Sequence, residues 1–66
     1  MSKVYLTLKP SEQVVTRCAA EIFSAYISAG LVREGSEGEW IQRAVREAIE
    51  IARLTDSWIT SDDEMS

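Results

Sequence analysis

Only one stretch of this chain has the alternation of a β-strand. Residues 3–9 read KVYLTLK, so that one side of the extended chain is apolar and the other is polar. Alternation with period two is typical of a strand with one buried face. Pro10 follows directly, and proline cannot continue a ladder because it has no backbone N–H group. We therefore expect a strand over residues 3–9, and a single strand cannot satisfy its own backbone hydrogen bonds.

The two faces of this expected strand differ in character. The apolar face, which we expect to contact the core, consists of Val4, Leu6 and Leu8. The polar face, which we expect to contact solvent or a ligand, consists of Lys3, Tyr5, Thr7 and Lys9.

An amphipathic helix is expected after the strand. Ser11 is a suitable N-cap, because its hydroxyl can accept from a free amide of the first turn. Apolar residues then recur at three- and four-residue spacing. These are Val14, Val15, Cys18, Ala19, Ile22, Phe23, Tyr26 and Ile27. Gly30 is expected to end the helix in a left-handed conformation, with Leu31 folding back against it.

A second helix is the clearest element of the sequence. Ser36 and Glu39 have the spacing of a capping box. The apolar stripe that follows contains Trp40, Ile41, Ala44, Val45, Ala48, Ile49 and Ala52. Two pairs with four-residue spacing are expected on the exposed face, Glu39 with Arg43 and Arg46 with Glu50. We expect the helix to continue to about residue 60; the alternative is that Asp56 ends it and that Ser57 to Thr60 is extended.

The composition restricts how so short a chain is stabilised. A chain of 66 residues buries only ~60% of its unfolded surface, and it usually needs a covalent link, a metal or a partner. Cys18 is the only cysteine and there is no histidine, which argues against disulfides, against a zinc site and against histidine-based catalysis. We therefore expect no enzyme, no cofactor and no metal, and association with another subunit as the source of stability.

Hydropathy and charge indicate the cellular location of the chain and the partners that it is suited to bind. No apolar run approaches the ~20 residues of a membrane span, and no secretion signal is present, so we expect a soluble cytoplasmic protein. The formal net charge of −4 argues mildly against binding to any polyanion, although basic residues lie early and acidic residues late. We expect one domain over residues 1–60 and an acidic, disordered tail over residues 61–66.

The strand obtains a partner if two copies of the chain associate. A two-fold axis would pair residues 3–9 of both copies in an antiparallel ribbon. The expected fold class is therefore mostly α with one N-terminal strand, a strand-helix-helix chain that forms an intertwined homodimer with a two-stranded antiparallel intersubunit ribbon. The expected dimer core comprises Val4, Leu6, Leu8, Ile22, Trp40, Ile41 and Val45. In the alternative arrangement, Ser57 to Thr60 pairs with Val4 to Leu8 within one chain.

This pattern resembles the ribbon-helix-helix family of DNA-binding proteins, of the Arc, MetJ and CopG type. The resemblance covers about residues 3–53, and it depends on KVYLTLKPSEQ, on a first helix ending at Gly30 and on SEGEWIQRAVREAIEIA. In such proteins the ribbon enters the major groove and the second helix docks its N-terminus on phosphate. The resemblance implies DNA contacts by Lys3, Tyr5, Thr7, Lys9 and Ser36.

Two hypotheses of function follow. The first is a homodimeric transcriptional regulator that binds double-stranded DNA through the ribbon. The second is a small dimeric protein–protein interaction module, antitoxin-like or structural, that binds no nucleic acid and contacts a protein partner through its C-terminal tail. Glu37 and Glu39 favour the second hypothesis, because they would repel phosphate at the start of the second helix.

Overall fold

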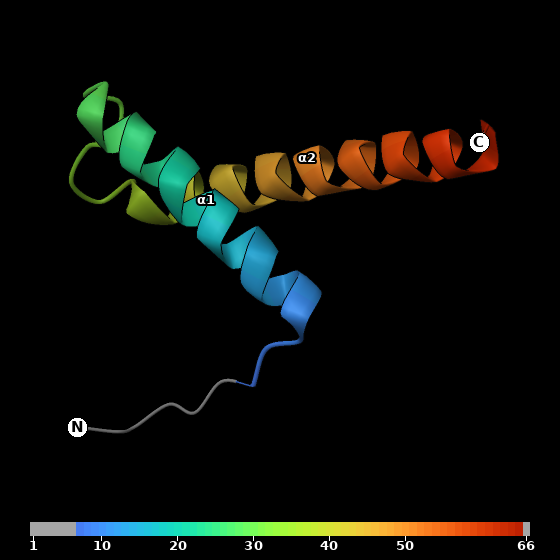
Figure 1. The fold of residues 1–66 in the computed structure, drawn as a ribbon. Helices are drawn as coiled ribbons and strands as arrows, with labels where there is room; N and C mark the ends of the chain where they lie inside the picture. Colours follow the sequence, from blue (N-terminus) through green and yellow to red (C-terminus); the bar gives the residue numbers. More distant parts are fainter. Residues whose placement is uncertain (1–6, 66) are drawn as a thin grey trace.

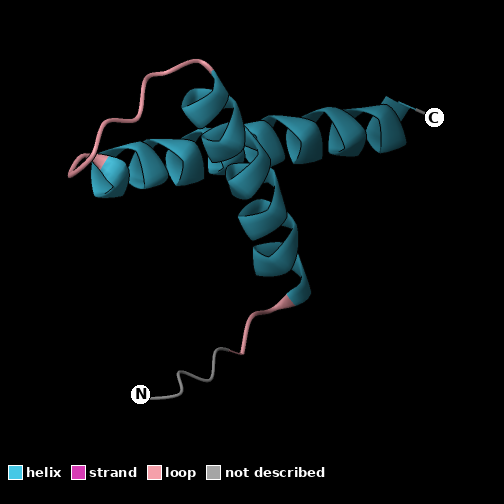
Figure 2. Cartoon of the chain, turned by 90° about the vertical axis from the view of Figure 1, so that its left-hand side faces the viewer, coloured by secondary structure: helices cyan, strands magenta, loops and turns pink. Residues whose placement is uncertain are grey.

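The protein is a hairpin of two crossing helices. The computed structural model describes residues 7–65. Helix α1 spans Pro10–Ser28 and helix α2 spans Glu37–Met65, and residues 29–36 connect them. The C-terminal half of α2 extends beyond α1 (Figure 1), and a view turned by 90° shows the same crossing without a strand in the described part of the chain (Figure 2).

The predicted strand-helix-helix fold is wrong, because the described segment before α1 is not a strand. Residues 7–9 form no ladder. Lys9 has the extended angles φ −67° and ψ 155°, but this is the geometry of a residue that precedes proline and caps a helix. Residues 3–6 of the predicted strand lie outside the described residues. The alternative pairing within one chain is also wrong, since Ser57 to Thr60 belong to α2.

The N-cap of α1 lies two residues earlier than the predicted cap. Lys9 is the N-cap and Pro10 is the first helical residue, so Ser11 already lies inside the first turn. Proline suits this position because its fixed φ is helical and its missing N–H group would have no partner there. The carboxylate of Glu12 accepts the Lys9 N–H group at 2.8 Å, which replaces the cap predicted from Ser11.

The end of α1 follows the prediction from Gly30. Gly30 has φ +76°, which a residue with a side chain rarely adopts. Its N–H group donates to the Ile27 carbonyl at 3.0 Å, and the Leu31 N–H group donates to the Tyr26 carbonyl at 3.1 Å. These two bonds form a Schellman motif, which satisfies carbonyl groups that the helix would otherwise leave free. The glycine signal is therefore confirmed.

Helix α2 begins after Ser36, but not through the predicted capping box. The Ser36 hydroxyl accepts the Arg33 N–H group at 3.0 Å and donates to the Arg33 carbonyl at 2.7 Å. It is thus used within the connection and not on the first turn of α2. The Glu37 carboxylate accepts the Gly35 N–H group at 3.0 Å, where Gly35 has φ +90°. The connection between the helices is therefore closed by its own local hydrogen bonds.

Helix α2 continues well past Asp56, which confirms the favoured prediction that this residue does not end it. The Thr55 hydroxyl donates to the Ile51 carbonyl one turn earlier at 2.7 Å, so its hydrogen-bonding requirement is met within the helix. The helix bounds include residues 61–65. Disorder of the acidic segment 61–66 in solution stays a prediction.

The contact between the helices is made by alanine. Ala19 of α1 is 6% exposed, and Ala44 and Ala48 of α2 are each 1% exposed. Small side chains let two helix backbones approach closely where they cross. Larger apolar residues of α1 pack partly around this contact: Val15, Cys18, Ile22, Phe23 and Tyr26. No side chain larger than alanine is fully buried among the residues that the structure describes.

Candidate interaction surface

Polar and aromatic groups form one cluster near the closed end of the hairpin. The rings of Tyr26 and Trp40 meet edge to face with centroids 5.0 Å apart. The guanidinium of Arg43 lies 5.4 Å from the Trp40 centroid and 6.0 Å from the Tyr26 centroid. Its Nε donates to Glu47 Oε1 at 3.0 Å. Because these residues belong to both helices, the cluster favours one rotation of α2 against α1.

The same cluster shifts the acid–base properties of its members. Tyr26 Oη is excluded from solvent and makes no hydrogen bond of ordinary geometry, yet the nearby Glu47 carboxylate raises the pKa of the Tyr26 hydroxyl. The Tyr26 hydroxyl and the Arg43 guanidinium together lower the pKa of the Glu47 carboxyl. Glu47 is therefore ionised at neutral pH and Tyr26 is neutral, which suits a structural contact rather than proton transfer.

Most large apolar side chains of the hairpin contact solvent. The most exposed are Trp58 at 72% and Val14 at 66%, on α2 and α1 respectively. The others between 38% and 59% exposed are Ile27, Leu31, Ile41, Val45, Ile49, Ile51, Leu54 and Ile59. At 100° per residue, the apolar side chains of α2 cover roughly 200° of its circumference. One crossing helix cannot cover an arc of that width.

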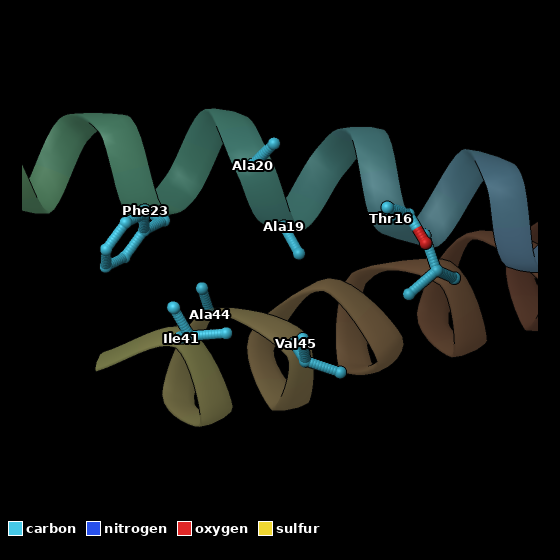
Figure 3. A pocket seen from close by; sticks show the side chains of 8 residues that line it. Thr16, Ala19, Ala20, Phe23, Ile41, Ala44 and Val45 are labelled. Carbon is cyan, nitrogen blue, oxygen red and sulfur yellow. The ribbon is translucent and has the colours of Figure 1, made fainter. Parts of the chain in front are cut away.

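Two apolar clefts flank the crossing. The first, here called the Phe23 cleft, has a volume of about 290 Å³ and is lined by Val15, Thr16, Ala19, Ala20, Phe23, Ile41, Ala44 and Val45. Figure 3 shows Phe23 and Ile41 facing each other across it, with Ala19 and Ala44 between the helices. A neighbouring hollow shares Val15, Thr16 and Val45 and continues to Leu8 and Ile49.

The second cleft, here called the Cys18 cleft, is lined by residues of the N-terminal half of α1 and of α2. These two segments diverge beyond the crossing (Figure 1). The volume of the cleft is about 320 Å³. The lining residues are Val14, Val15, Cys18, Ala48, Ile51, Ala52, Thr55, Asp56 and Ile59. Cys18 and Thr16 lie on opposite sides of α1 by helical periodicity, so the two clefts open on different sides of the hairpin.

The residues predicted to contact DNA are not brought together. Lys3 and Tyr5 lie outside the described residues. Thr7 and Lys9 are exposed before α1, whereas the half-buried Ser36 lies before α2. The 19 residues of α1, about 28 Å in length, separate Lys9 from the connection that contains Ser36. The described chain thus forms no single polar surface from Thr7, Lys9 and Ser36.

The residues predicted for the dimer core fall into three groups. Val4 and Leu6 lie outside the described residues. Leu8, Ile22 and Trp40 are half-buried within the single chain. Ile41 and Val45 are 46% and 38% exposed. These last two residues are therefore available for contact with another chain.

Several residues of the exposed surface were not among the predicted sites. Val14 was assigned only to the apolar stripe of the first helix, and Ile51, Leu54, Trp58 and Ile59 were not among the predicted site residues. The width of the α2 stripe was the available signal. It indicates an apolar arc with more than one neighbour, and the single chain supplies only one.

Other kinds of site were also sought in the described residues. In that part of the chain, no helix is long and apolar enough to cross a membrane. Nor do the described residues bring together three or more metal-ligating side chains. Comparison with protein-family models, with curated proteins and with solved structures found no match for this chain.

Proposed function

We propose that the chain is a non-catalytic protein–protein interaction module that acts as a homodimer of helical hairpins. One observation carries the proposal: large apolar side chains on both helices remain exposed on two sides of the crossing. Contiguous exposed apolar surface on a small protein is typical of a contact with another chain. The clefts are lined almost wholly by apolar groups, which suits binding of side chains rather than chemistry on a polar substrate.

The area of this surface supports a second copy as the partner. The chain exposes 5945 Å² of accessible surface, whereas a compact protein of 7.4 kDa exposes about 4,200 Å². That excess of about 1,700 Å² per chain is larger than the ~800 Å² per partner that a standard interface buries, so the open hairpin has enough surface for contact with a second copy. The radius of gyration is 15.2 Å, against about 11 Å for a compact chain of this length.

The DNA-binding hypothesis remains a prediction that no described residue favours. It requires a ribbon, and residues 7–9 are not a strand. It also requires a phosphate site at the start of α2, where Glu37 and Glu39 lie and the Ser36 hydroxyl is bonded to Arg33. A protein partner at the C-terminal tail is likewise an untested addition to the homodimer.

Sedimentation equilibrium from low micromolar to millimolar chain concentration tests the homodimer. We expect a mass of twice 7.4 kDa at the higher concentrations. Val45→Asp places a charge on the Phe23 cleft, and it should weaken association at least tenfold, because a charge buried without a partner is strongly unfavourable. Ser57→Asp is the matched control, since it adds the same charge at an exposed α2 position outside every cleft described above.

Helix content by circular dichroism confirms that both variants fold. A wild-type chain that stays monomeric over the whole range contradicts the proposal. A Val45→Asp variant that dimerises like the wild type contradicts a role of the Phe23 cleft in the interface. A labelled DNA duplex titrated with the same sample at low salt separates the hypotheses. Tight binding that Lys3→Ala and Lys9→Ala abolish would favour the DNA-binding regulator instead.

A further inference from the structure

The Cys18 cleft lacks a large side chain to fill it. Four of its nine lining residues are small, namely Cys18 of α1 and Ala48, Ala52 and Thr55 of α2, and the larger apolar ones are Val14, Val15, Ile51 and Ile59. Well-packed interiors place large residues opposite small ones, because a void leaves its lining without partners. Asp56 is the one charged residue in the lining, so the cleft combines an apolar floor with a strong hydrogen-bond acceptor.

Trp58 has the complementary properties. It is 72% exposed, the highest value among the large apolar side chains of the described residues. It lies on α2 one turn beyond Thr55, yet it is not part of the lining of the cleft in its own chain. Its indole ring supplies a large apolar area, and its N–H group needs an acceptor when buried. The Asp56 carboxylate is an acceptor of the required kind.

We propose that Trp58 of each copy occupies the Cys18 cleft of a second copy, an assignment that rests on the proposed homodimer. In a two-fold dimer every contact is made twice, so a protruding residue and a receiving cleft on the same chain satisfy both copies at once. Trp58 lies in the C-terminal half of α2, which extends past α1 (Figure 1) and also supplies Ile51, Ala52, Thr55, Asp56 and Ile59 to the cleft. This arrangement covers the most exposed aromatic residue and fills the cleft on that side.

Tryptophan fluorescence tests the assignment directly. The chain has two tryptophans, and Trp40→Phe leaves Trp58 as the only one while it keeps an aromatic ring against Tyr26. We expect the emission maximum of this variant to move to shorter wavelength as the dimer fraction rises in sedimentation. The single thiol of Cys18 provides a second readout on the wild-type chain, since its rate of labelling by a maleimide should fall over the same range.

A truncation measures how much the contact contributes to affinity. Burying the exposed 72% of an indole in each copy predicts that Trp58→Ala weakens dimerisation at least about 100-fold and restores fast Cys18 labelling. Ile27→Ala is the control, because Ile27 is 54% exposed but lies in the last turn of α1, outside both clefts. We expect this control to change the dissociation constant less than tenfold.

The outcomes separate the assignment from the homodimer. A dimer in which Trp58 emission and Cys18 labelling do not change with concentration refutes the assignment and leaves the homodimer intact. A monomer at every concentration refutes both. Short-wavelength emission already present in the monomer shows that Trp58 packs within its own chain, which also refutes the assignment.

Discussion

Replacement of Ala48 by leucine tests the crossing on which the whole hairpin depends. Ala48 is 1% exposed and packs with Ala44 against Ala19 of the other helix. Leucine has almost the same helix propensity as alanine, so the substitution leaves the intrinsic stability of α2 nearly unchanged. The larger side chain must therefore push the two backbones apart at the crossing, unless it turns into the Cys18 cleft that Ala48 also lines.

The expected magnitude follows from the tightness of the contact. Adding methylene groups to a filled contact costs about 1–3 kcal/mol. For a chain of about this length, each kcal/mol lowers the melting temperature by roughly 4–8 °C. We therefore expect Ala48→Leu to melt at least about 4 °C below the wild type. Ala25→Leu is the matched control, because Ala25 is exposed on α1 and the same substitution there should change stability by less than about 0.5 kcal/mol.

Thermal unfolding followed by circular dichroism at 222 nm is a suitable assay. All samples are held at one protein concentration, because association makes the melting temperature depend on concentration. Equal melting temperatures for Ala48→Leu and the wild type would refute the alanine crossing. A more stable Ala48→Leu variant would also refute it, since the leucine would then be accommodated in the Cys18 cleft without separating the helices.

Two further perturbations test local features. Gly30→Ala should destabilise the chain by about 1–2 kcal/mol in a urea titration, because Gly30 has φ +76°. Gly38→Ala is the control: it lies within α2, where a Cβ atom meets open space, and should be neutral or stabilising in the same titration. Glu47→Gln tests the lowered pKa of Glu47. The ionised Glu47 carboxylate stabilises the fold fully above the ordinary pKa of 4.5, and this stabilisation is lost as pH falls through the lowered pKa. Wild type and Glu47→Gln should therefore differ in melting temperature at pH 7 and converge at low pH, and a constant difference would contradict this. The raised pKa of Tyr26 affects stability at alkaline pH. The neutral Tyr26 hydroxyl stabilises the fold below pH 10.0, and this stabilisation is lost as pH rises further. The melting temperature of Tyr26→Phe should therefore fall less at alkaline pH than that of the wild type.

The two ends of α1 show which local sequence signals are sufficient to predict where a helix begins and ends. Gly30 ends the helix as predicted, because only a residue without a side chain adopts its positive φ easily. The start was misjudged by preferring Ser11, although proline fits the first helical position and places the cap at Lys9. Both signals are local, and both were present in the sequence.

The charged residues of α2 show where local signals are insufficient. Arg43 has a glutamate one turn before it and another one turn after it, at Glu39 and Glu47. Helical spacing allows either pair, and the predicted one was Glu39 with Arg43. The structure pairs Arg43 with Glu47, and the rings of Tyr26 and Trp40 lie against the same guanidinium. The choice depends on Tyr26, which is far away in sequence and comes from the other helix.

The predicted strand failed for a related reason. Alternation in residues 3–9 indicates a strand only if a second strand is available, and the described chain provides none. Thr7 to Lys9 instead lead into α1, with Lys9 extended because proline follows it. The identification of a ribbon, and of DNA contacts on it, depended on that missing partner.

The sequence by itself determined two amphipathic helices, the glycine that ends the first, and an apolar arc on α2 too wide for one neighbour. These properties follow from periodicity and from the conformational limits of single residues, which act over one or two turns. The tertiary structure alone decided that the helices cross at Ala19, Ala44 and Ala48 and diverge beyond that point. Because the crossing angle determines what each face contacts, it leaves Trp58 and the Cys18 cleft exposed on the same chain.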